Sequence, residues 1–289
     1  MNASASQTAR APIGGHPRRI VLVVFGVVSM TLLILLPLFS VFYYALREGW
    51  SVYAGHLKDP ETLHAIGLTL LAALVAVPVN TVFGVTAAWT LSKFDFPGRR
   101  LVTSLIELPL SISPIIIGVA YLFVFGLQGL FGEWLIDHDL RLVFSVPSIV
   151  IVTTIVTVPF VFREVLPLMQ SQGPNEELAA ISLGAGGVKT FLKVTLPNIK
   201  WALIYGVSLT FARSLGEFGS VAVVSGAVRG ETNTMTLQIH MLFDDRSQAG
   251  AFAVASILTS IALVTMLVKT WVENRETHRL LRGMGTVKE

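Results

Sequence analysis

The segment NEELAAISLGAGGVKTFLKVTLP, residues 175–197, is the longest polar interruption in an otherwise apolar chain. Six apolar segments surround it, and none of them shares its mixture of acidic, basic, glycine and small residues. Loops that carry polar, turn-forming sequence between rigid elements are where functional contacts concentrate. The segment therefore predicts a membrane protein that contacts a partner on one face of the bilayer through residues 175–197.

The composition is typical of a chain that lies in lipid. Of its 289 residues, 53% are hydrophobic and 13% are charged, and the mean hydropathy is +0.70. Soluble domains carry about 25% charged residues, roughly twice this share. The chain has no cysteine, which excludes disulfides, thiolate chemistry and cysteine-ligated metals.

Six segments are long enough for a helix to cross the hydrocarbon of a bilayer, which takes about 20 residues. An even number of crossings puts both termini on one side of the membrane. The first segment is too long for the apolar part of a signal peptide and no cleavage pattern follows it, so we interpret it as an anchor. The six predicted transmembrane helices lie at residues 20–46, 63–91, 101–126, 142–169, 201–226 and 249–271.

Basic residues are distributed unevenly between the two sides. Cytoplasmic loops carry an excess of Lys and Arg, and one set of loops and tails holds 14 of them against 5 on the other. We therefore expect both termini and residues 175–197 to be cytoplasmic. The spread over several short loops excludes a nucleic-acid partner. The inner residues are Arg10, Arg18, Arg19, Lys93, Arg99, Arg100, Lys189, Lys193, Lys200, Lys269, Arg275, Arg279, Arg282 and Lys288; the outer ones are Arg47, Lys58, Arg141, Arg229 and Arg246.

This pattern divides the chain into four parts. A cytoplasmic tail (1–19) precedes the first transmembrane helix and its outer loop (20–60). The main transmembrane domain (61–272) includes the segment 175–197, and a second cytoplasmic tail (273–289) ends the chain.

Charged residues inside the predicted spans are few. A charge exposed to lipid costs at least about 2.5 kcal/mol, so each should face protein or water. Arg213 and Glu217 are four residues apart and would share a helix face about 18 to 24 Å from the inner surface. They are either a neutralised pair that joins helices or a contact for the transported substrate. Glu107, about two turns from the inner end of its span, is a further candidate for the translocation pathway.

The sequence contains no recognisable catalytic motif. There is no HExxH or GxSxG pattern and no carboxylate cluster with metal-ligand spacing, and the six histidines are dispersed. The stretch GAGGVKT, residues 184–190, is similar to a phosphate loop, but Val188 rather than glycine precedes Lys189, and no buried strand leads into it. We therefore expect no enzyme activity, no metal and no cofactor in this chain.

Residues 175–197 resemble the EAA motif of ABC importer permeases, which reads EAA, three residues, G, nine residues and I-x-L-P. The motif implies a segment that docks onto a cytoplasmic ATPase; the alternative is a hairpin that lies on the bilayer without a partner. The glutamate of the motif falls on Leu178, so an acidic contribution comes from Glu177 or is partly lost. The matching residues are Ala179, Ala180, Gly184, Val194, Leu196 and Pro197.

Local preferences predict two short helices in this segment. Asn175 can cap the first, which should run to about Ala180 with acidic residues in its first turn. Gly184 offers the left-handed conformation that ends a helix. Residues 188–194 are then expected to form a second short helix, ended by Pro197.

A wider resemblance covers most of residues 60–272. FARSLGEFG (211–219), VVSGAVRGET (223–232) and LSKFDFPGRR (91–100) resemble sulfate/thiosulfate permease subunits, most closely those of the CysW type. The family implies the six-helix type I ABC importer (MetI-like) permease fold in the bacterial inner membrane. It also implies partners: a CysT-type permease in a heterodimer, two copies of a cytoplasmic ATPase and a periplasmic sulfate/thiosulfate-binding protein.

The loop at 223–234 is expected on the periplasmic side, where a loaded binding protein would dock. Arg229 and Glu231 are candidate contacts, or else they only cap the helix and loop ends. Molybdate permeases share part of the GEFG region, so molybdate or another oxyanion is an alternative substrate. An ATPase-independent secondary transporter or channel is the alternative from another class, which internal repeats would favour, and no convincing repeat is visible.

Overall fold

The structure is a computed structural model that describes residues 16–285. Every regular element in that part of the chain is helical and none is a strand, which confirms the predicted all-α fold. In chain order the elements are α1 (His16–Leu46), α2 (Trp50–Lys58), α3 (Pro60–Lys93), α4 (Arg99–Ser111), α5 (Pro114–Phe125), α6 (Gly132–Asp137), α7 (Val146–Gln172), α8 (Asn175–Ser182), α9 (Gly187–Thr190), the π-helix η1 (Phe191–Thr195), α10 (Leu196–Leu215), α11 (Gly219–Val224), α12 (Met235–Asp244) and α13 (Gln248–Gly285).

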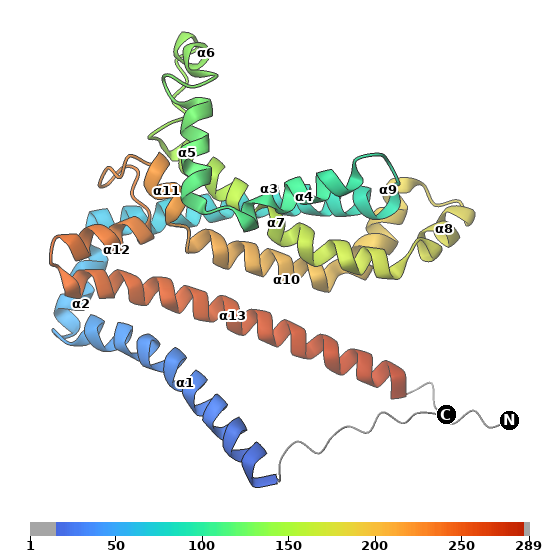
Figure 1. Ribbon diagram of the computed structural model, residues 1–289, viewed down its shortest axis with the longest axis horizontal. Helices are drawn as coiled ribbons and strands as arrows, with labels where there is room; N and C mark the ends of the chain where they lie inside the picture. The colour runs from blue at the N-terminus through green and yellow to red at the C-terminus, as the bar shows by residue number, and fades with distance from the viewer. Residues whose placement is uncertain (1–15, 286–289) are drawn as a thin grey trace.

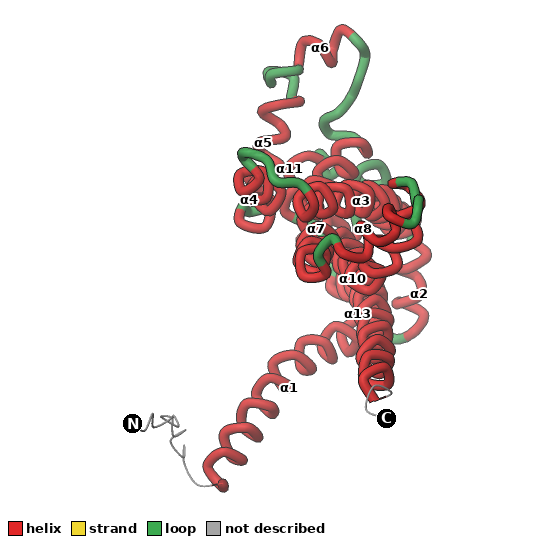
Figure 2. The backbone as a smooth tube through the Cα atoms, turned by 90° about the vertical axis from the view of Figure 1, so that its right-hand side faces the viewer, coloured by secondary structure: helices red, strands yellow, loops and turns green. Residues whose placement is uncertain are grey.

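The long helices run along the long axis of the molecule. Helices α3, α7 and α10 pack against one another at its centre, and α13 packs against α10 (Figure 1). The short helices α8 and α9 lie at one end of this bundle and α2 and α12 at the other, while α5 and α6 project to one side. Helix α1 contacts α13 and then diverges from it, as both views show (Figure 2).

Two glycines let α3 and α10 approach α7 closely at Val161. A Cβ added at Gly84 of α3 would lie 2.8 Å from Val161 Cβ and 2.9 Å from the backbone nitrogen of Phe162. A Cβ added at Gly206 of α10 would lie 2.9 Å from Val161 Cα. Small residues at helix crossings in membranes allow such contact between backbones. Gly84 and Gly206 therefore set the spacing of the three central helices.

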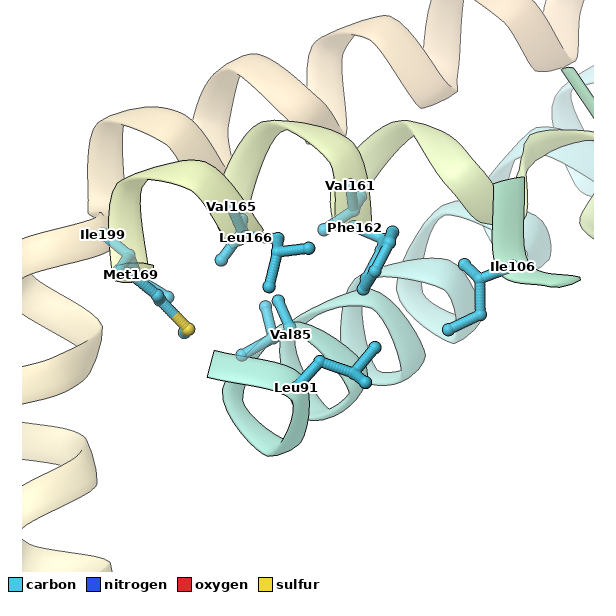
Figure 3. Packing of buried hydrophobic residues seen from close by; sticks show 10 residues of the cluster. Val85, Leu91, Ile106, Val161, Phe162, Val165, Leu166, Met169 and Ile199 are labelled. Atoms are coloured by element: carbon cyan, nitrogen blue, oxygen red, sulfur yellow. The ribbon is translucent and has the colours of Figure 1, made fainter. Parts of the chain in front are cut away.

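Buried apolar side chains fill the space between these helices. Phe162 and Val165 of α7 point toward Val85 and Leu91 of α3, and Ile106 of α4 closes the side (Figure 3). Interlocking side chains of this kind hold membrane helices together, because lipid offers no hydrophobic driving force between them. A second cluster, nearer to α12, joins α3, α5, α7, α11 and α12 through Leu68, Ala72, Tyr121, Ile149, Val152, Val221, Val224 and Leu237.

A buried polar contact links α3 to α7 as well. The side-chain amide of Asn80 donates hydrogen bonds to Thr157 Oγ1, 2.7 Å away, and to the carbonyl oxygen of Thr154, 3.1 Å away. The Asn80 side chain is fully buried. A polar group at this depth needs partners within the protein, and such bonds also fix how neighbouring helices are rotated.

Four helices within residues 16–285 are long and apolar enough to cross a membrane, namely α1, α3, α7 and α13. Helices α4 and α5 would make a fifth span together, but their axes differ by 112°. The predicted span at 101–126 therefore consists of two helices with a sharp bend between them. Pro114 explains the break, because its ring forces the preceding Ser113 into an extended conformation and ends α4.

The predicted span at 201–226 is also interrupted. Helix α10 ends at Leu215, three non-helical residues follow, and α11 begins at Gly219. All six predicted apolar segments are thus found as helices, with two of them broken. By length and composition the described residues give four spans, or five with the bent pair.

Helix α1 presents apolar side chains to its surroundings. Within its membrane-type stretch, Ile20–Leu46, an 18-residue window has a mean hydropathy of 2.8 and 0% of that window is buried. It meets α13 at its end, where Ala45 is buried and the rings of Tyr44 and Phe252 stack with centroids 5.1 Å apart. Such a surface belongs in lipid or against another protein. The predicted tails, 1–19 and 273–289, lie partly outside the described residues; the backbone of α13 is helical to Gly285.

Candidate functional site

Residues 175–197, here called the coupling segment, form a capped helix pair at one end of the bundle. Helix α8 ends in a Schellman motif, in which the amide of Ala185 donates to the carbonyl of Ala180 (3.0 Å) and that of Gly184 to Ile181 (2.9 Å). Gly184 has φ +83°, the left-handed conformation that the sequence predicts for it. Helix α9 follows after two further residues. The turn at Gly184 therefore sets the angle between α8 and the rest of the segment.

Two details of the predicted segment are wrong. Asn175 is the first residue of α8 rather than its cap, because the chain turns at Gly173 (φ +67°) and Pro174 occupies the N-cap position. Pro197 does not end the second helix. Helix α9 continues through the π-helix η1 into α10, and Pro197 is the second residue of α10.

Glu177 faces the bundle rather than the exposed side of the segment. Its Oε2 lies 3.0 Å from Lys93 Nζ at the end of α3, and its Oε1 accepts a hydrogen bond of 2.6 Å from Thr195 Oγ1 of η1. The side chains of Lys93 and Glu177 are only 13% and 16% exposed. Lys93 also donates to the carbonyl oxygen of Gly173 at 2.9 Å. Both carboxylate oxygens of Glu177 are thus engaged within the chain.

Further hydrogen bonds extend this contact. The side-chain amide of Asn198 in α10 donates to Glu176, and Gln172 of α7 donates to the carbonyl oxygen of Asn198 at 3.3 Å. These groups leave a void of about 10 Å³ between them, roughly the room of one water molecule. The Lys93–Glu177 cluster, as we name it, consists of Lys93, Gln172, Gly173, Glu176, Glu177, Thr195 and Asn198.

The opposite side of the coupling segment is exposed and apolar. Leu183 is 88% exposed and Val188 76%, and Leu178, at the position of the motif glutamate, is 55% exposed. Exposed apolar side chains in this density mark a surface that another protein or the bilayer covers. Among the predicted motif residues, Ala179, Gly184 and Pro197 are exposed, whereas Ala180, Val194 and Leu196 are half-buried.

Arg213 and Glu217 form an ion pair, but not along one helix face. Arg213 lies in the last turn of α10, while Glu217 lies in the break before α11, because Gly216 ends α10. The distance from Arg213 Nη1 to Glu217 Oε2 is 2.6 Å, and the two side chains are 31% and 1% exposed. The predicted pairing is therefore present, with the carboxylate buried and the guanidinium partly open.

The buried carboxylate of Glu217 also holds the start of α11. Its Oε1 accepts from the backbone amide of Ser220 (3.0 Å) and from Ser220 Oγ (2.8 Å). The carbonyl oxygen of Glu217 accepts from Thr236 Oγ1 of α12 at 2.8 Å. A carboxylate at a helix start satisfies amides that have no partner inside the helix. Glu217 therefore joins α10, α11 and α12 at the broken part of the fifth segment.

The loop candidates lie at the end of the bundle opposite the coupling segment. Arg229 is ion-paired with Asp245 at the end of α12, and its Nη1 lies 4.0 Å from Glu61 of α3. The hydrogen bond to Asp245 raises the pKa of Arg229 above its usual value. The side chain of Glu231 is exposed, and its carbonyl oxygen lies 3.0 Å from His64 Nε2. Arg229 is thus bound within the chain, whereas Glu231 offers a free-standing carboxylate at the surface.

Glu107 lies on α4, half-buried and remote in sequence from the other charged candidates. Among the side chains that the structure describes, those of residues 20–271, no three His, Asp or Glu are grouped so that they could hold a metal ion. Sequence reasoning missed Lys93, Thr195 and Asn198 as partners of the coupling segment. Lys93 is 84 positions from Glu177 and carried no sequence signal beyond its place at a helix end.

The described residues thus form a bundle of membrane-type helices with an exposed apolar surface at one end and a polar loop region at the other. Residues 80–278 match the family described as binding-protein-dependent transport system inner membrane component. The chain belongs to this family, and it is a multi-pass protein of the inner membrane.

Individual relatives and a solved structure show which permeases this chain is similar to. The chain is 46% identical over 254 residues to the sulfate transport system permease protein CysW of Escherichia coli (strain K12), which covers 88% of this chain and 87% of that protein. It is 33% identical over 250 residues to the permease protein CysT of the same strain, covering 86% and 90%. A chain of a bacterial alginate ABC transporter, solved with an alginate-bound periplasmic protein, has a TM-score of 0.73 at 16% identity and covers 89% and 94%. The resemblance to CysW-type permeases and the importer fold are confirmed.

Proposed function

We propose that this chain is a membrane-spanning permease subunit of an ATP-driven importer for sulfate or thiosulfate. The observation that carries the proposal is the coupling segment, a capped helix pair with an exposed apolar face, in a chain 46% identical to a sulfate permease. The chain itself hydrolyses nothing and needs no metal or cofactor. Its work is to change conformation when a partner hydrolyses ATP.

The proposed partners follow from the relatives. A CysT-type permease pairs with this chain to complete the pathway, and the chain's likeness to both kinds of permease suits a pseudo-symmetric pair. Two cytoplasmic ATPase subunits bind the coupling segments of the two permeases. A periplasmic sulfate/thiosulfate-binding protein delivers the anion at the opposite end, near Arg229 and Glu231.

The chain also has a proposed orientation in the membrane. Both termini and the coupling segment are cytoplasmic, as the excess of Lys and Arg on that side indicates. The coupling segment and the 223–234 loop lie at opposite ends of the bundle (Figure 1), which suits contacts on opposite faces of one membrane. ATP-driven closure of the ATPases moves α8 and switches the pathway between inward-facing and outward-facing states.

Arg213 is the proposed contact for the anion inside the pathway. A doubly charged anion in a low-dielectric medium needs water or cationic partners. The partly exposed guanidinium supplies positive charge, and Glu217 reduces it, so that the anion is attracted without being trapped. The other role for this pair is purely structural, and the two are separated by the double variant described in the Discussion. Glu107 remains a second pathway candidate.

Reconstitution of the purified complex tests the function. The complex of both permeases and the ATPase, placed in proteoliposomes with the binding protein, should take up labelled sulfate and thiosulfate only when ATP is hydrolysed. Labelled molybdate, supplied in parallel, tests the oxyanion alternative. Uptake that continues without ATP or without the ATPase would indicate a secondary transporter or channel and contradict the proposal.

A further inference from the structure

The Lys93–Glu177 cluster ties α8 to three of the long helices. Lys93 ends α3, Gln172 and Gly173 end α7, and Thr195 and Asn198 lie where η1 meets α10. Lys93 and Thr195 bind Glu177, and Asn198 binds Glu176. The end of α7 joins through these partners, because Gly173 accepts from Lys93 and Gln172 donates to the carbonyl oxygen of Asn198. Side-chain contacts therefore hold the coupling segment against the bundle, in addition to its two chain connections.

We infer that Glu177 is a positioning residue whose ion pair with Lys93 and hydrogen bond from Thr195 make α8 move together with α3, α7 and α10. The inference rests on the proposed function, since it concerns how ATPase motion reaches the pathway. The carboxylate acts inside this chain, and the ATPase is contacted by the apolar face that includes Leu178.

The geometry argues against a direct contact between Glu177 and the ATPase. Both carboxylate oxygens have partners, and the side chain is only 16% exposed. To reach an ATPase, Glu177 would have to leave Lys93, which is 13% exposed, without its counter-ion. Removing one partner from a poorly solvated ion pair is strongly unfavourable. Leu178 is exposed at the neighbouring position and is available for apolar docking.

The π-helix explains how Thr195 reaches Glu177. Residues 191–195 form the wide helical turn that is rare in proteins and concentrated at functional sites. The wider turn rotates the residues that follow it relative to a regular α-helix. Thr195 is buried there and donates to Glu177 Oε1 at 2.6 Å. The local distortion therefore joins the two halves of the coupling segment to each other as well as to α3.

Charge exchange tests the inference. Glu177→Lys and Lys93→Glu should each still copurify with the ATPase and hydrolyse ATP at the basal rate. Uptake of sulfate per ATP hydrolysed should fall about fivefold or more in each, in the range of typical coupling between sites. The exchanged pair, Lys93→Glu with Glu177→Lys, should recover most of this ratio, and Lys93→Arg should keep it. Arg100→Glu, an exposed charge reversal nearby, is the matched control and should behave as the parent.

Three outcomes overturn the inference. An unchanged ratio of uptake to hydrolysis in both single variants means that the cluster transmits nothing. Loss of ATPase binding in Glu177→Lys alone, without recovery in the exchanged pair, means that Glu177 contacts the ATPase. If charge reversal prevents insertion, Glu177→Gln and Thr195→Val must show the lowered ratio, and a parental ratio in both counts against the inference. Failure of the parent chain to bind any ATPase would instead contradict the proposed function itself.

Discussion

Arg213 and Glu217 combine a buried carboxylate with a partly exposed cation, so their two single variants should differ. In Arg213→Gln the buried Glu217 carboxylate keeps its bonds to Ser220 but loses its counter-charge, which costs about 3 kcal/mol. We expect this variant to lose most sulfate uptake and to unfold at a lower temperature in detergent. Glu217→Gln should in addition assemble poorly, since Glu217 also holds the start of α11.

The double variant Arg213→Gln with Glu217→Gln separates the two roles of this pair. Under an anion-contact role the double variant should still transport poorly, because the cation that attracts the anion is missing. Uptake measured in proteoliposomes at matched protein content distinguishes an anion contact from a structural pair. Recovery of uptake in the double variant would show that the pair is structural and that Arg213 does not touch the anion.

A charge reversal at Arg229 breaks an ion pair within the chain, whereas a reversal at Glu231 changes only an exposed side chain. Arg229 is bound to Asp245, whereas the Glu231 side chain is exposed, so Glu231→Lys is the cleaner probe of a contact with the binding protein. We expect Glu231→Lys to weaken the stimulation of ATP hydrolysis by loaded binding protein while basal hydrolysis stays unchanged. Arg229→Glu should do the same and also loosen the loop. Parental stimulation in both variants would assign the two residues to loop structure alone.

At the scale of the element, the turn after α8 depends on one glycine. Gly184 has φ +83°, and a β-branched residue there would be strained by roughly 1 to 2 kcal/mol. Gly184→Val should insert normally but re-aim α9, and so lose ATPase copurification and uptake. Gly186→Val is the matched control, because Gly186 has φ −71° and open space around its Cβ. Parental copurification with Gly184→Val would speak against docking through this segment.

The contact of α10 with α7 depends on Gly206 in a comparable way. An added Cβ would lie 2.9 Å from Val161 Cα, a backbone atom that cannot move without shifting α7. Gly206→Ala should therefore lower the stability of the bundle by about 1 to 3 kcal/mol. Gly67→Ala on α3, where nothing lies within 4 Å, is the control. Thermal unfolding in detergent measures both, and equal midpoints would mean that the helices separate without cost.

At the scale of the whole molecule, the absence of cysteine offers a direct test of orientation. Ser182→Cys in α8 and Val228→Cys in the opposite loop are both exposed positions. A membrane-impermeant thiol reagent added to intact cells that lack an outer barrier should label Val228→Cys but not Ser182→Cys. Disruption of the membrane should then allow labelling at Ser182. The reverse pattern would invert the proposed orientation.

The sequence by itself determined the features that depend on local chemistry. Runs of about 20 apolar residues predicted the helices because lipid leaves the backbone no other partner than itself. Gly184 predicted a left-handed turn because glycine lacks the Cβ that disfavours this conformation. Ala179, Ala180, Gly184 and Pro197 located the coupling segment through their resemblance to a family motif, and its contact with an ATPase stays a prediction.

Tertiary structure alone decided which distant residues meet. The ion pair of Lys93 with Glu177 depends on how the end of α3 lies against α8, and many basic residues could have served as well. Glu217 lies off the helix face expected for it because Gly216 ends α10, and Ser220 then donates its backbone amide and its hydroxyl to the carboxylate. The bend at Pro114 was visible as a proline, but packing of α5 on α11 sets where α5 points. Long-range contacts are chosen by the fit of whole helices, and that fit is not encoded in any one segment of the chain.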